Sequence, residues 1–281
     1  MKKIDIICPL YNAENYIISL NKSLLMQKDV KLNEIKYILT ESKDNTEQLL
    51  KDNNIDYKLI KKSEFSHSLV RENAAFESKA DIVVFVTQDV VIEDDLWLYH
   101  LTKSIASGEC AAAYSRQISK FNNIEKYTRE KNYPSISSIV SKDDIEKLGL
   151  RTFFFSDASS AIDLKVFKEL NGYDGKRLPI SEDMYIAYKI IMNGYKIKYE
   201  ADSIVYHSHN FKLKELYDRY KLTGKFFKEN DYLDKFGTNK SGGGLAKYVL
   251  KRALKEKNIR VLFRFPFDMG ARFIGMKVGK R

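Results

Sequence analysis

The chain has 281 residues, 44% of them hydrophobic and 31% charged, with a formal net charge of +10. This length and composition can bury a sizeable core, which excludes wholesale disorder, and two cysteines (Cys8 and Cys110) are too few for a disulfide framework and indicate a reducing compartment. No apolar run approaches the roughly 18–20 residues that cross a bilayer, and the short N-terminal apolar stretch contains Asp5, which argues against a cleaved signal peptide.

The first half of the chain alternates short β-branched runs with amphipathic segments of helix length. Strands are predicted at Ile4–Cys8, Ile35–Leu39, Asp56–Ile60, Ile82–Val86 and Cys110–Tyr114. Helices are predicted over residues 14–27, 68–79 and 94–107. This alternation indicates an α/β sandwich with a mostly parallel central sheet, in which ligands bind beyond the carboxyl ends of the strands.

Glycine placement argues against the two commonest nucleotide-binding folds. The first glycine of the chain is Gly108, whereas a Rossmann fingerprint and a Walker A loop both need glycine for close approach of the backbone to phosphate. The glycine-rich loop of a sugar-phosphate nucleotidyltransferase is disfavoured for the same reason. A nucleotide bound by this chain would therefore have its phosphates held by side chains and a metal ion.

The second half is less regular. Residues 116–150 are polar, have few strand signals and are predicted to form a connection or a flexible flap. Helices are predicted over residues 164–171, 182–193 and 212–230, with a hairpin-like segment at Lys196–Tyr206. The run Gly242-Gly243-Gly244 is expected to separate the last of these helices from a C-terminal tail.

Polar residues follow the first two predicted strands. The first strand ends in Cys8-Pro9-Leu10-Tyr11-Asn12, which is compatible with a rigid turn as well as with a ligand site. After the second strand, Glu41 and Asp44 are candidates to accept hydrogen bonds from a nucleobase or a ribose. The alternative is that Asp44 or Asn45 caps the following helix.

A very hydrophobic strand, Ile82–Val86, is followed by Thr87-Gln88-Asp89, which places a carboxylate at the rim of the sheet. Divalent cations prefer oxygen ligands, and one or two carboxylates with phosphate oxygens suffice for a metal-bound diphosphate, so Asp89 suits that role. A helix cap is the alternative. Arg71, together with His67, is a candidate to contact the diphosphate, although a salt bridge would equally account for the arginine.

Two further motifs lie in the second half. Glu182 and Asp183 open a predicted helix, where acidic residues are common for electrostatic reasons alone, but Asp183 is also a candidate general base for deprotonating a hydroxyl. His207 and His209 follow a strand and, being two residues apart, would face the same way. Such a pair suits a metal or a phosphate, with ordinary surface histidines as the alternative.

Taken in order, these motifs resemble the family-2 glycosyltransferases of the GT-A fold, and among them the bacterial rhamnosyltransferase branch. The matching segments are Pro9-Leu10-Tyr11-Asn12, Phe65-Ser66-His67-Ser68 with Arg71, Thr87-Gln88-Asp89, Phe155–Ile162, Glu182-Asp183, Gly194–Ile197, His207-Ser208-His209, and Arg219-Tyr220 with Gly224. The resemblance covers about residues 3–225. The sequence departs from the family pattern at Glu41, where aspartate is usual, and at Asp157, where asparagine is frequent.

The resemblance implies an inverting transfer of a sugar, in the first place L-rhamnose from dTDP-L-rhamnose, onto a hydroxyl of a lipid-linked precursor of a cell-surface glycan. It implies Asp183 as the catalytic base, and Mg²⁺ or Mn²⁺ held by Asp89 with an imidazole of His207 or His209. The donor-binding residues it implies are Pro9, Tyr11, Asn12, Glu41, Asp44, His67, Arg71, Gln88 and Asp89. The acceptor-binding residues it implies are Asp157, Ser159 and Glu182.

The expected organisation is a catalytic domain over residues 1–230, followed by a basic tail over residues 241–281. Within the catalytic domain, the nucleotide-sugar half extends to about residue 115, and residues 116–230 form the acceptor half. Two other functions remain open. One is a family-2 transferase with a UDP-hexose donor, and the other is a non-enzymatic, basic-tailed protein that binds a membrane or RNA.

The tail carries nearly all of the excess charge. It has 11 basic residues and two acidic ones, hence +9, whereas the first 240 residues carry +1. Aliphatic and aromatic residues interleaved with Lys and Arg are typical of a helix that lies on an anionic membrane. We therefore expect a cytoplasmic protein on the inner face of the cell membrane and no nucleic-acid partner. The alternative is that the tail aromatics pack on the catalytic domain.

Overall fold

The computed structural model describes the backbone of residues 1–281 and the side chains of residues 1–237 and 243–281. The chain divides into two compact units. Residues 1–116, 135–142 and 153–207 form the first unit, and residues 117–134, 143–152 and 208–281 form the second. Each unit has an apolar cluster of its own.

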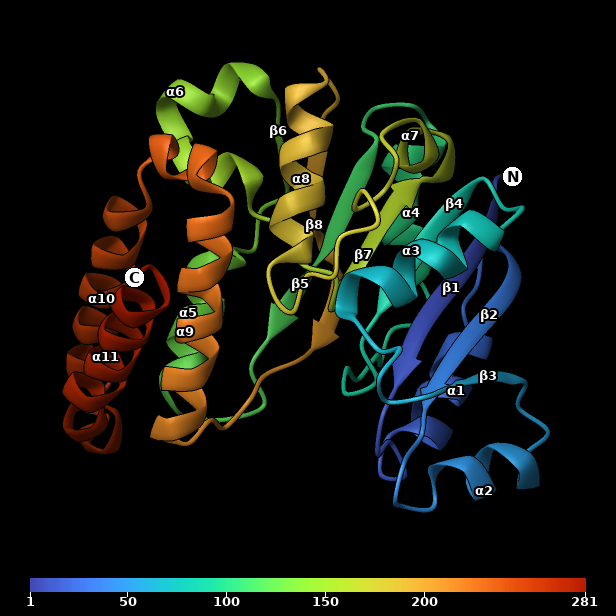
Figure 1. The fold of residues 1–281 in the computed structure, drawn as a ribbon, viewed down its shortest axis with the longest axis horizontal. Helices are drawn as coiled ribbons and strands as arrows, with labels where there is room; N and C mark the ends of the chain where they lie inside the picture. Colours follow the sequence, from blue (N-terminus) through green and yellow to red (C-terminus); the bar gives the residue numbers. More distant parts are fainter. The chain divides into compact units, whose positions relative to one another are not determined.

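The first unit is built on an eight-stranded sheet with strand order β3-β2-β1-β4-β7-β5-β8-β6 (Figure 1). The strands are β1 (Lys3–Leu10), β2 (Lys31–Thr40), β3 (Tyr57–Ile60), β4 (Ile82–Val86), β5 (Ala112–Ile118), β6 (Ser138–Val140), β7 (Ser159–Asp163) and β8 (Ile197–Tyr206). Strands β3, β2, β1 and β4 are parallel, and β7 runs antiparallel to both β4 and β5. The mostly parallel central sheet expected from the sequence is confirmed.

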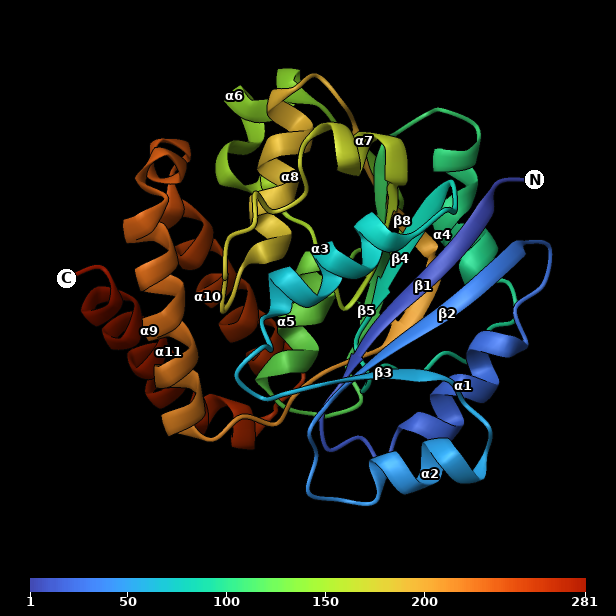
Figure 2. The same cartoon turned by 45° about the vertical axis from the view of Figure 1, so that its right-hand side comes forward.

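Helices cover both faces of this sheet (Figure 2). They are α1 (Ile17–Leu25), α2 (Thr46–Asp52), α3 (His67–Glu77), α4 (Trp97–Ala106), α7 (Leu164–Glu169) and α8 (Glu182–Met192). Alternate residues of β1, among them Ile6, pack with the apolar sides of α1 and α4. On the opposite face, Phe85 of β4 contacts Phe167 of α7 with 5.9 Å between ring centroids, and Phe167 also contacts Phe76 of α3. The sheet is thus the middle layer of an α/β/α sandwich.

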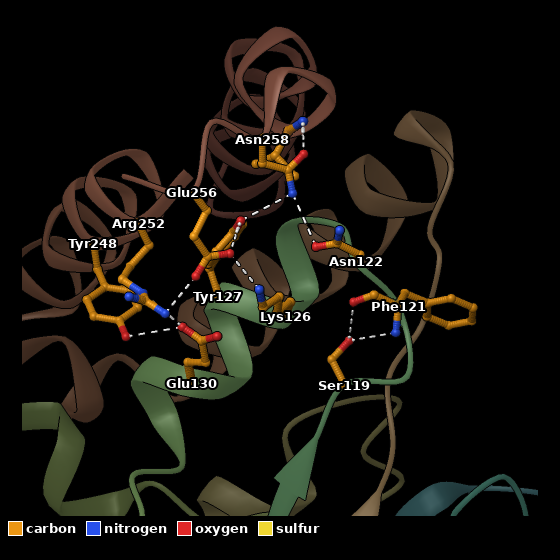
Figure 3. A network of polar contacts seen from close by, with 11 residues as sticks. Ser119, Phe121, Asn122, Lys126, Tyr127, Glu130, Tyr248, Arg252, Glu256 and Asn258 are labelled. Atoms are coloured by element: carbon orange, nitrogen blue, oxygen red, sulfur yellow. Dashed lines mark hydrogen bonds and ion pairs between the residues drawn. The ribbon is translucent and has the colours of Figure 1, made fainter. Parts of the chain in front are cut away.

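The second unit is helical. It contains α5 (Ile124–Asn132), α6 (Ile145–Leu148), α9 (Leu213–Glu229), α10 (Thr238–Lys255) and α11 (Ile259–Gly279), with short 3₁₀ turns at Lys142–Asp144, Gly149–Phe153 and Asp231–Phe236. Helix α10 lies along α5, where Tyr127 packs with Val249 and Ala253. Ion pairs join the same two helices, including Arg252 to Glu130 with a separation of 3.1 Å between Nε and Oε2 (Figure 3).

Helix α11 packs closely against α9 through glycines. A Cβ atom on Gly275 would lie 2.5 Å from the carbonyl oxygen of Tyr217, and one on Gly279 would collide with the backbone of Lys221. The missing side chains therefore let the two backbones approach each other. Within the described part of the chain, no helix combines the length and the apolar character needed to cross a membrane.

Three sequence-based expectations about the second half are wrong. Residues 116–150 are not a flap, because they contain the end of β5, then α5, β6 and α6. Lys196–Tyr206 is not a hairpin but contains one long strand, β8, whose antiparallel partner β6 comes from residues 138–140. Helix α10 runs through Gly243 and Gly244, where a break was expected, since packing on α5 outweighs the low helix propensity of glycine. Gly242 lies outside the residues whose side chains are described.

Candidate active site

Gln88 ties the loop after β4 to the loop after β1. Its Oε1 accepts a hydrogen bond from the backbone N–H of Tyr11 at 2.7 Å, and its Nε2 donates to the Tyr11 carbonyl at 2.9 Å. A side-chain amide satisfies both groups of one backbone residue in this way. Pro9 lies two residues past Ile7, where the β1–β4 ladder ends, so its missing N–H costs no bond to β4. Gln88 therefore fixes the position of the next residue, Asp89.

The loop after β2 is held against the same strand end. Asn12 adopts a left-handed backbone with φ of 48°, a conformation that asparagine tolerates better than most residues. Its Oδ1 accepts from the Lys43 N–H at 3.1 Å, and its own N–H donates to Ser42 Oγ at 2.9 Å. Asn12 thus binds two loops to each other, which is a structural role at the predicted donor site.

The carboxylates predicted to contact the nucleoside lie in this same region but have different surroundings. Asp44 accepts from Thr46 Oγ1 at 2.6 Å and from the Glu14 N–H at 3.0 Å. Partial burial opposes ionisation, but these hydrogen bonds outweigh it and lower the pKa of Asp44. Glu41 is exposed and accepts from the Lys62 N–H at 3.2 Å. The ammonium of Lys62 lies 5.2 Å from the centre of the exposed Tyr11 ring.

Asp89 and His207 come together although 118 positions separate them in the sequence. Val91 and Tyr206 exchange two backbone hydrogen bonds, of 3.0 and 2.9 Å, which bring the segment after β4 to the end of β8. His207 Nε2 lies 3.4 Å from Asp89 Oδ2. His207 is buried, whereas the Asp89 side chain is 25% exposed. The pair offers an imidazole nitrogen and a carboxylate oxygen at the carboxyl end of β4, a donor set that fits a divalent cation.

Arg71 is enclosed. Its side chain is 2% exposed, its Nη1 lies 3.3 Å from Glu182 Oε1, and the same nitrogen donates to the His67 carbonyl at 2.8 Å. Burial disfavours the charged form, but Glu182 and other nearby carboxylates outweigh it and raise the pKa of Arg71. Arg71 therefore links α3 to the first residue of α8, while the His67 ring is exposed. The predicted contact between Arg71 and the diphosphate would need a guanidinium at the surface, and this guanidinium is buried.

Two residues predicted to bind the acceptor are enclosed as well. Asp157 Oδ1 accepts from Ser160 Oγ at 2.7 Å, and Oδ2 accepts from the Tyr173 hydroxyl at 2.8 Å. Burial raises the pKa of Asp157, and the Arg71 charge opposes that rise. Ser159 is fully buried, with its hydroxyl 2.6 Å from Ser115 Oγ. Both side chains are therefore bound inside the first unit rather than presented to a ligand.

Asp183 stands in the first turn of α8. Ser181, the residue before the helix, is left-handed with φ of 62°, a strained conformation for a residue with a side chain. Asp183 is half-buried, and its Oδ1 accepts from the Met184 N–H at 2.8 Å. A carboxylate at a helix N-terminus is stabilised in its ionised form, which is the form that a general base needs.

Sequence reasoning missed Glu72, which organises the loop that leads to α8. Its buried carboxylate accepts from the backbone N–H groups of Tyr173 and Gly175. Burial raises the pKa of Glu72, although these two hydrogen bonds oppose the rise. Ser68, on the same helix, accepts from the Leu178 N–H at 2.9 Å. The sequence does contain a signal for this role, because Glu72 lies on the side of α3 that carries the buried residues.

Comparison with known proteins agrees with this geometry. The family described as "Glycosyl transferase family 2" matches residues 5–170. The chain is 32% identical to the O-antigen chain rhamnosyltransferase RfbN of Salmonella typhimurium, over 99% of this chain and 90% of the relative. It is 30% identical to the O-antigen chain rhamnosyltransferase WbaN of Salmonella anatum, over 100% of this chain and 90% of that protein.

A solved structure shares the fold along nearly the whole chain. The mannosyltransferase PcManGT of Pyrobaculum calidifontis, crystallised with GDP-Man and Mn²⁺, superimposes with a TM-score of 0.65 at 14% identity, covering 99% of this chain and 87% of that one. The likeness at this identity concerns the fold. The α/β/α sandwich is therefore that of the GT-A glycosyltransferases, and the chain is a glycosyltransferase that belongs to glycosyl transferase family 2.

Proposed function

We propose that the protein transfers L-rhamnose from dTDP-L-rhamnose, with inversion, to a hydroxyl of a glycan precursor in O-antigen synthesis. The observation that carries the proposal is the Asp89–His207 pair at the carboxyl end of β4, 3.4 Å apart, in a family-2 glycosyltransferase. The choice of rhamnose is supported by two relatives of nearly full coverage that are named rhamnosyltransferases.

A divalent cation, Mg²⁺ or Mn²⁺, would be held by Asp89 and His207. His209, two residues further along the chain, is the third predicted ligand. When bound, the ion supplies charge neutralisation for the leaving diphosphate. The partly exposed carboxylate of Asp89 and the buried imidazole of His207 fit such an ion, and PcManGT was crystallised with Mn²⁺.

The donor nucleoside would lie at the rim made by the loops after β1, β2 and β3. Tyr11 offers an exposed ring and Glu41 an exposed carboxylate, while Pro9, Asn12, Asp44 and Gln88 shape the loops that carry them. His67 is exposed at the start of α3 and is the remaining candidate for a contact with the donor.

The acceptor hydroxyl would be deprotonated by Asp183 as it attacks the anomeric carbon. Glu182 sets the direction of the neighbouring Asp183, because its carboxylate is anchored by the buried Arg71. Asp157 and Ser159 would act one step further back, as positioning residues, since neither side chain reaches the surface. This arrangement supplies a fixed base for a single displacement.

The tail would hold the enzyme on the inner face of the cell membrane, where a lipid-linked acceptor resides. On α11, five large apolar side chains are exposed: Ile259, Phe263, Phe267, Phe273 and Ile274. Exposed lysines, Lys251 and Lys255, stand on α10 beside exposed Leu250 and Leu254. Apolar side chains flanked by cations favour an anionic lipid surface, to which each basic group adds on the order of 1 kcal/mol.

Donor choice is tested by thermal unfolding of the purified protein with Mn²⁺ and one nucleotide-sugar at a time. We expect dTDP-L-rhamnose to raise the melting temperature more than UDP-glucose or no ligand, because a ligand of the folded state stabilises it by mass action. A larger shift with UDP-glucose would replace rhamnose by a hexose as the donor sugar.

A further inference from the structure

The second unit contains a cavity of about 320 Å³, and of the residues in the catalytic scheme only the predicted metal ligand His209 lines it. The N-terminal turns of three helices line it: Asn123 and Ile124 from α5, Leu216 from α9, and Arg260 and Val261 from α11. Its volume is in the range of small-molecule sites. All lining residues belong to the second unit.

Three helix N-termini make this cavity electropositive. Each contributes up to about half a positive elementary charge through the N–H groups of its first turn, which Glu125 in α5 and Glu215 in α9 partly offset. Helix α11 has no acidic residue in its first turn and carries Arg260 there, although the helix dipole disfavours a cation at that end. Among the residues whose side chains are described, Arg260 has no hydrogen bond or ion pair. An anion in the cavity would pair with Arg260, whose side chain is exposed, and would be favoured by the helix termini.

The two carboxylates of the cavity are already neutralised. Asp268 pairs with Arg264 at 3.0 Å, and Glu125 pairs with Arg272 at 3.3 Å. Arg260 is thus the charge in excess. Arg264 and Arg272 already donate to other groups, whereas Arg260 has a planar fork of donors available, and such a fork recognises phosphate.

Arg272 is held rigidly at this wall. Its side chain is 12% exposed, its Nη1 donates to the Tyr220 hydroxyl at 2.6 Å, and its guanidinium lies 5.1 Å from the centre of the Tyr220 ring. Its Nε is buried and, among the described residues, has no hydrogen-bond partner. A buried donor without a partner lowers the free energy of unfolding, because its lost hydration is not replaced by a hydrogen bond.

Asparagines connect the helix starts to one another. Asn258 caps α11 by accepting from the Val261 N–H, and its Nδ2 donates to Asn122 Oδ1 at 3.2 Å (Figure 3). Asn123 caps α5, and its Nδ2 donates to Asn210 Oδ1 at 3.2 Å. The cavity is therefore a built site with fixed walls.

We propose that this cavity binds a phosphate or diphosphate group carried by the sugar acceptor, with the rings of Phe121 and Phe211 beside the adjoining sugar. The acceptor assignment rests on the proposed function. On α11, Arg260 and Arg264 line the cavity, while Phe263 and Phe267 of the same turns are exposed. If a phosphate links the sugar to a lipid, the phosphate would bind in the cavity, and the lipid chain would lie beside the apolar face of α11.

Binding is tested by isothermal titration calorimetry of inorganic pyrophosphate into the full-length protein in EDTA. The chelator removes divalent ions, and an Asp89→Ala background removes a predicted metal ligand in the first unit. We expect wild type and Asp89→Ala to bind equally and Arg260→Glu to bind at least about ten-fold more weakly. Lys277→Glu, on the same helix but outside the cavity, is the matched control and should bind like wild type.

Kinetics separate this claim from the proposed function. Arg260→Glu should raise the KM for a phosphate-linked acceptor at least about ten-fold and leave the KM for the donor unchanged. If wild type binds pyrophosphate through Arg260 but transfers no sugar, the cavity stands and the proposed function fails. Absence of pyrophosphate binding, or an equal loss in the Arg260→Glu and Lys277→Glu proteins, would overturn the cavity as a phosphate site.

Discussion

In the proposed mechanism, Asp183 is the residue on which the chemistry depends most. Replacing it by asparagine keeps the shape of the side chain and removes its ability to take a proton. We expect Asp183→Asn to lower kcat by about 10²–10⁴-fold and to leave donor binding intact, since the carboxylate serves the acceptor. Initial rates of sugar transfer, with donor affinity measured separately, check this. An Asp183→Asn enzyme with near wild-type turnover would remove the general base from the account.

The Asp89–His207 pair predicts metal dependence. Asp89→Ala and His207→Ala should each abolish the increase in donor affinity that Mn²⁺ causes, because each removes a ligand atom. His100→Ala is the matched control, since His100 lies on α4 and contacts Lys103. Titration of donor with and without Mn²⁺ decides the matter. Donor affinity that is insensitive both to EDTA and to the Asp89 substitution would contradict the metal site.

The two cysteine thiols, Cys8 and Cys110, are expected to resist alkylation in the native protein. Burial raises the pKa of Cys8, and that of Cys110, from 9.0 to about 12. Below pH 10 both remain protonated in the native protein, so iodoacetamide should modify them only after unfolding. The unfolded chain loses these protons at lower pH than the folded one, and stability should therefore fall as pH rises from 9 to 12. Alkylation of the native protein at pH 8, followed by mass spectrometry, would show modification if this account were wrong.

At the scale of elements, the glycines of α11 have opposite roles. Gly275 faces the backbone of α9, whereas a Cβ on Gly270 would meet nothing within 4 Å among the described residues. Gly270→Ala should stabilise the protein by about 0.5–1 kcal/mol through helix propensity. Gly275→Ala should destabilise it by about 1–3 kcal/mol through overpacking. Thermal unfolding of the two variants checks the pair, and shifts of the same sign would contradict the close packing of α9 and α11.

The local sequence pattern was sufficient to predict an element where that element packs against its neighbours in sequence. Strand β4 was predicted with its observed bounds, Ile82–Val86, because a continuous apolar run marks a strand covered on both faces. Helix α5 was missed because its partners, such as Val249 of α10, come from the other end of the chain. The glycines of α10 misled the prediction for the same reason, since packing overrode propensity.

The candidate site divides in the same way. Motif spacing named Asp89, Asp183 and His207, but the approach of Asp89 to His207 depends on the bridge between Val91 and Tyr206, which no local pattern encodes. The burial of Arg71 against Glu182 could not be predicted either, because the sequence identifies a charged residue but not the partner of that charge. Sequence therefore predicts which residues matter better than it predicts what each one touches.

For the whole molecule, the uneven charge and the exposed aromatic face of α11 predict binding to anionic membranes. The Phe263→Ser, Phe267→Ser double variant should bind phosphatidylglycerol vesicles more weakly than wild type, because the two exposed rings are the parts that would enter the lipid. Tyr99→Ser, at an exposed aromatic of α4, is the matched control. Raised salt should weaken wild-type binding as well.

Deletion of the tail would not test this prediction. Val249, Ala253 and Val261 belong to the apolar cluster of the second unit, so removal of α10 and α11 would expose that cluster. Vesicle sedimentation with the point variants avoids the difficulty. Equal sedimentation of wild type and the double variant would show that the aromatic face of α11 does not contact the membrane.

We propose that this family-2 glycosyltransferase transfers rhamnose onto a lipid-linked glycan. The most direct measurement is the incorporation of radiolabelled rhamnose from dTDP-L-rhamnose into the lipid fraction of membranes from cells that lack the protein. We expect incorporation with the wild-type protein and none with Asp89→Ala or Asp183→Asn. Label that stays in the donor with wild type, while a UDP-hexose donor is consumed, would contradict it.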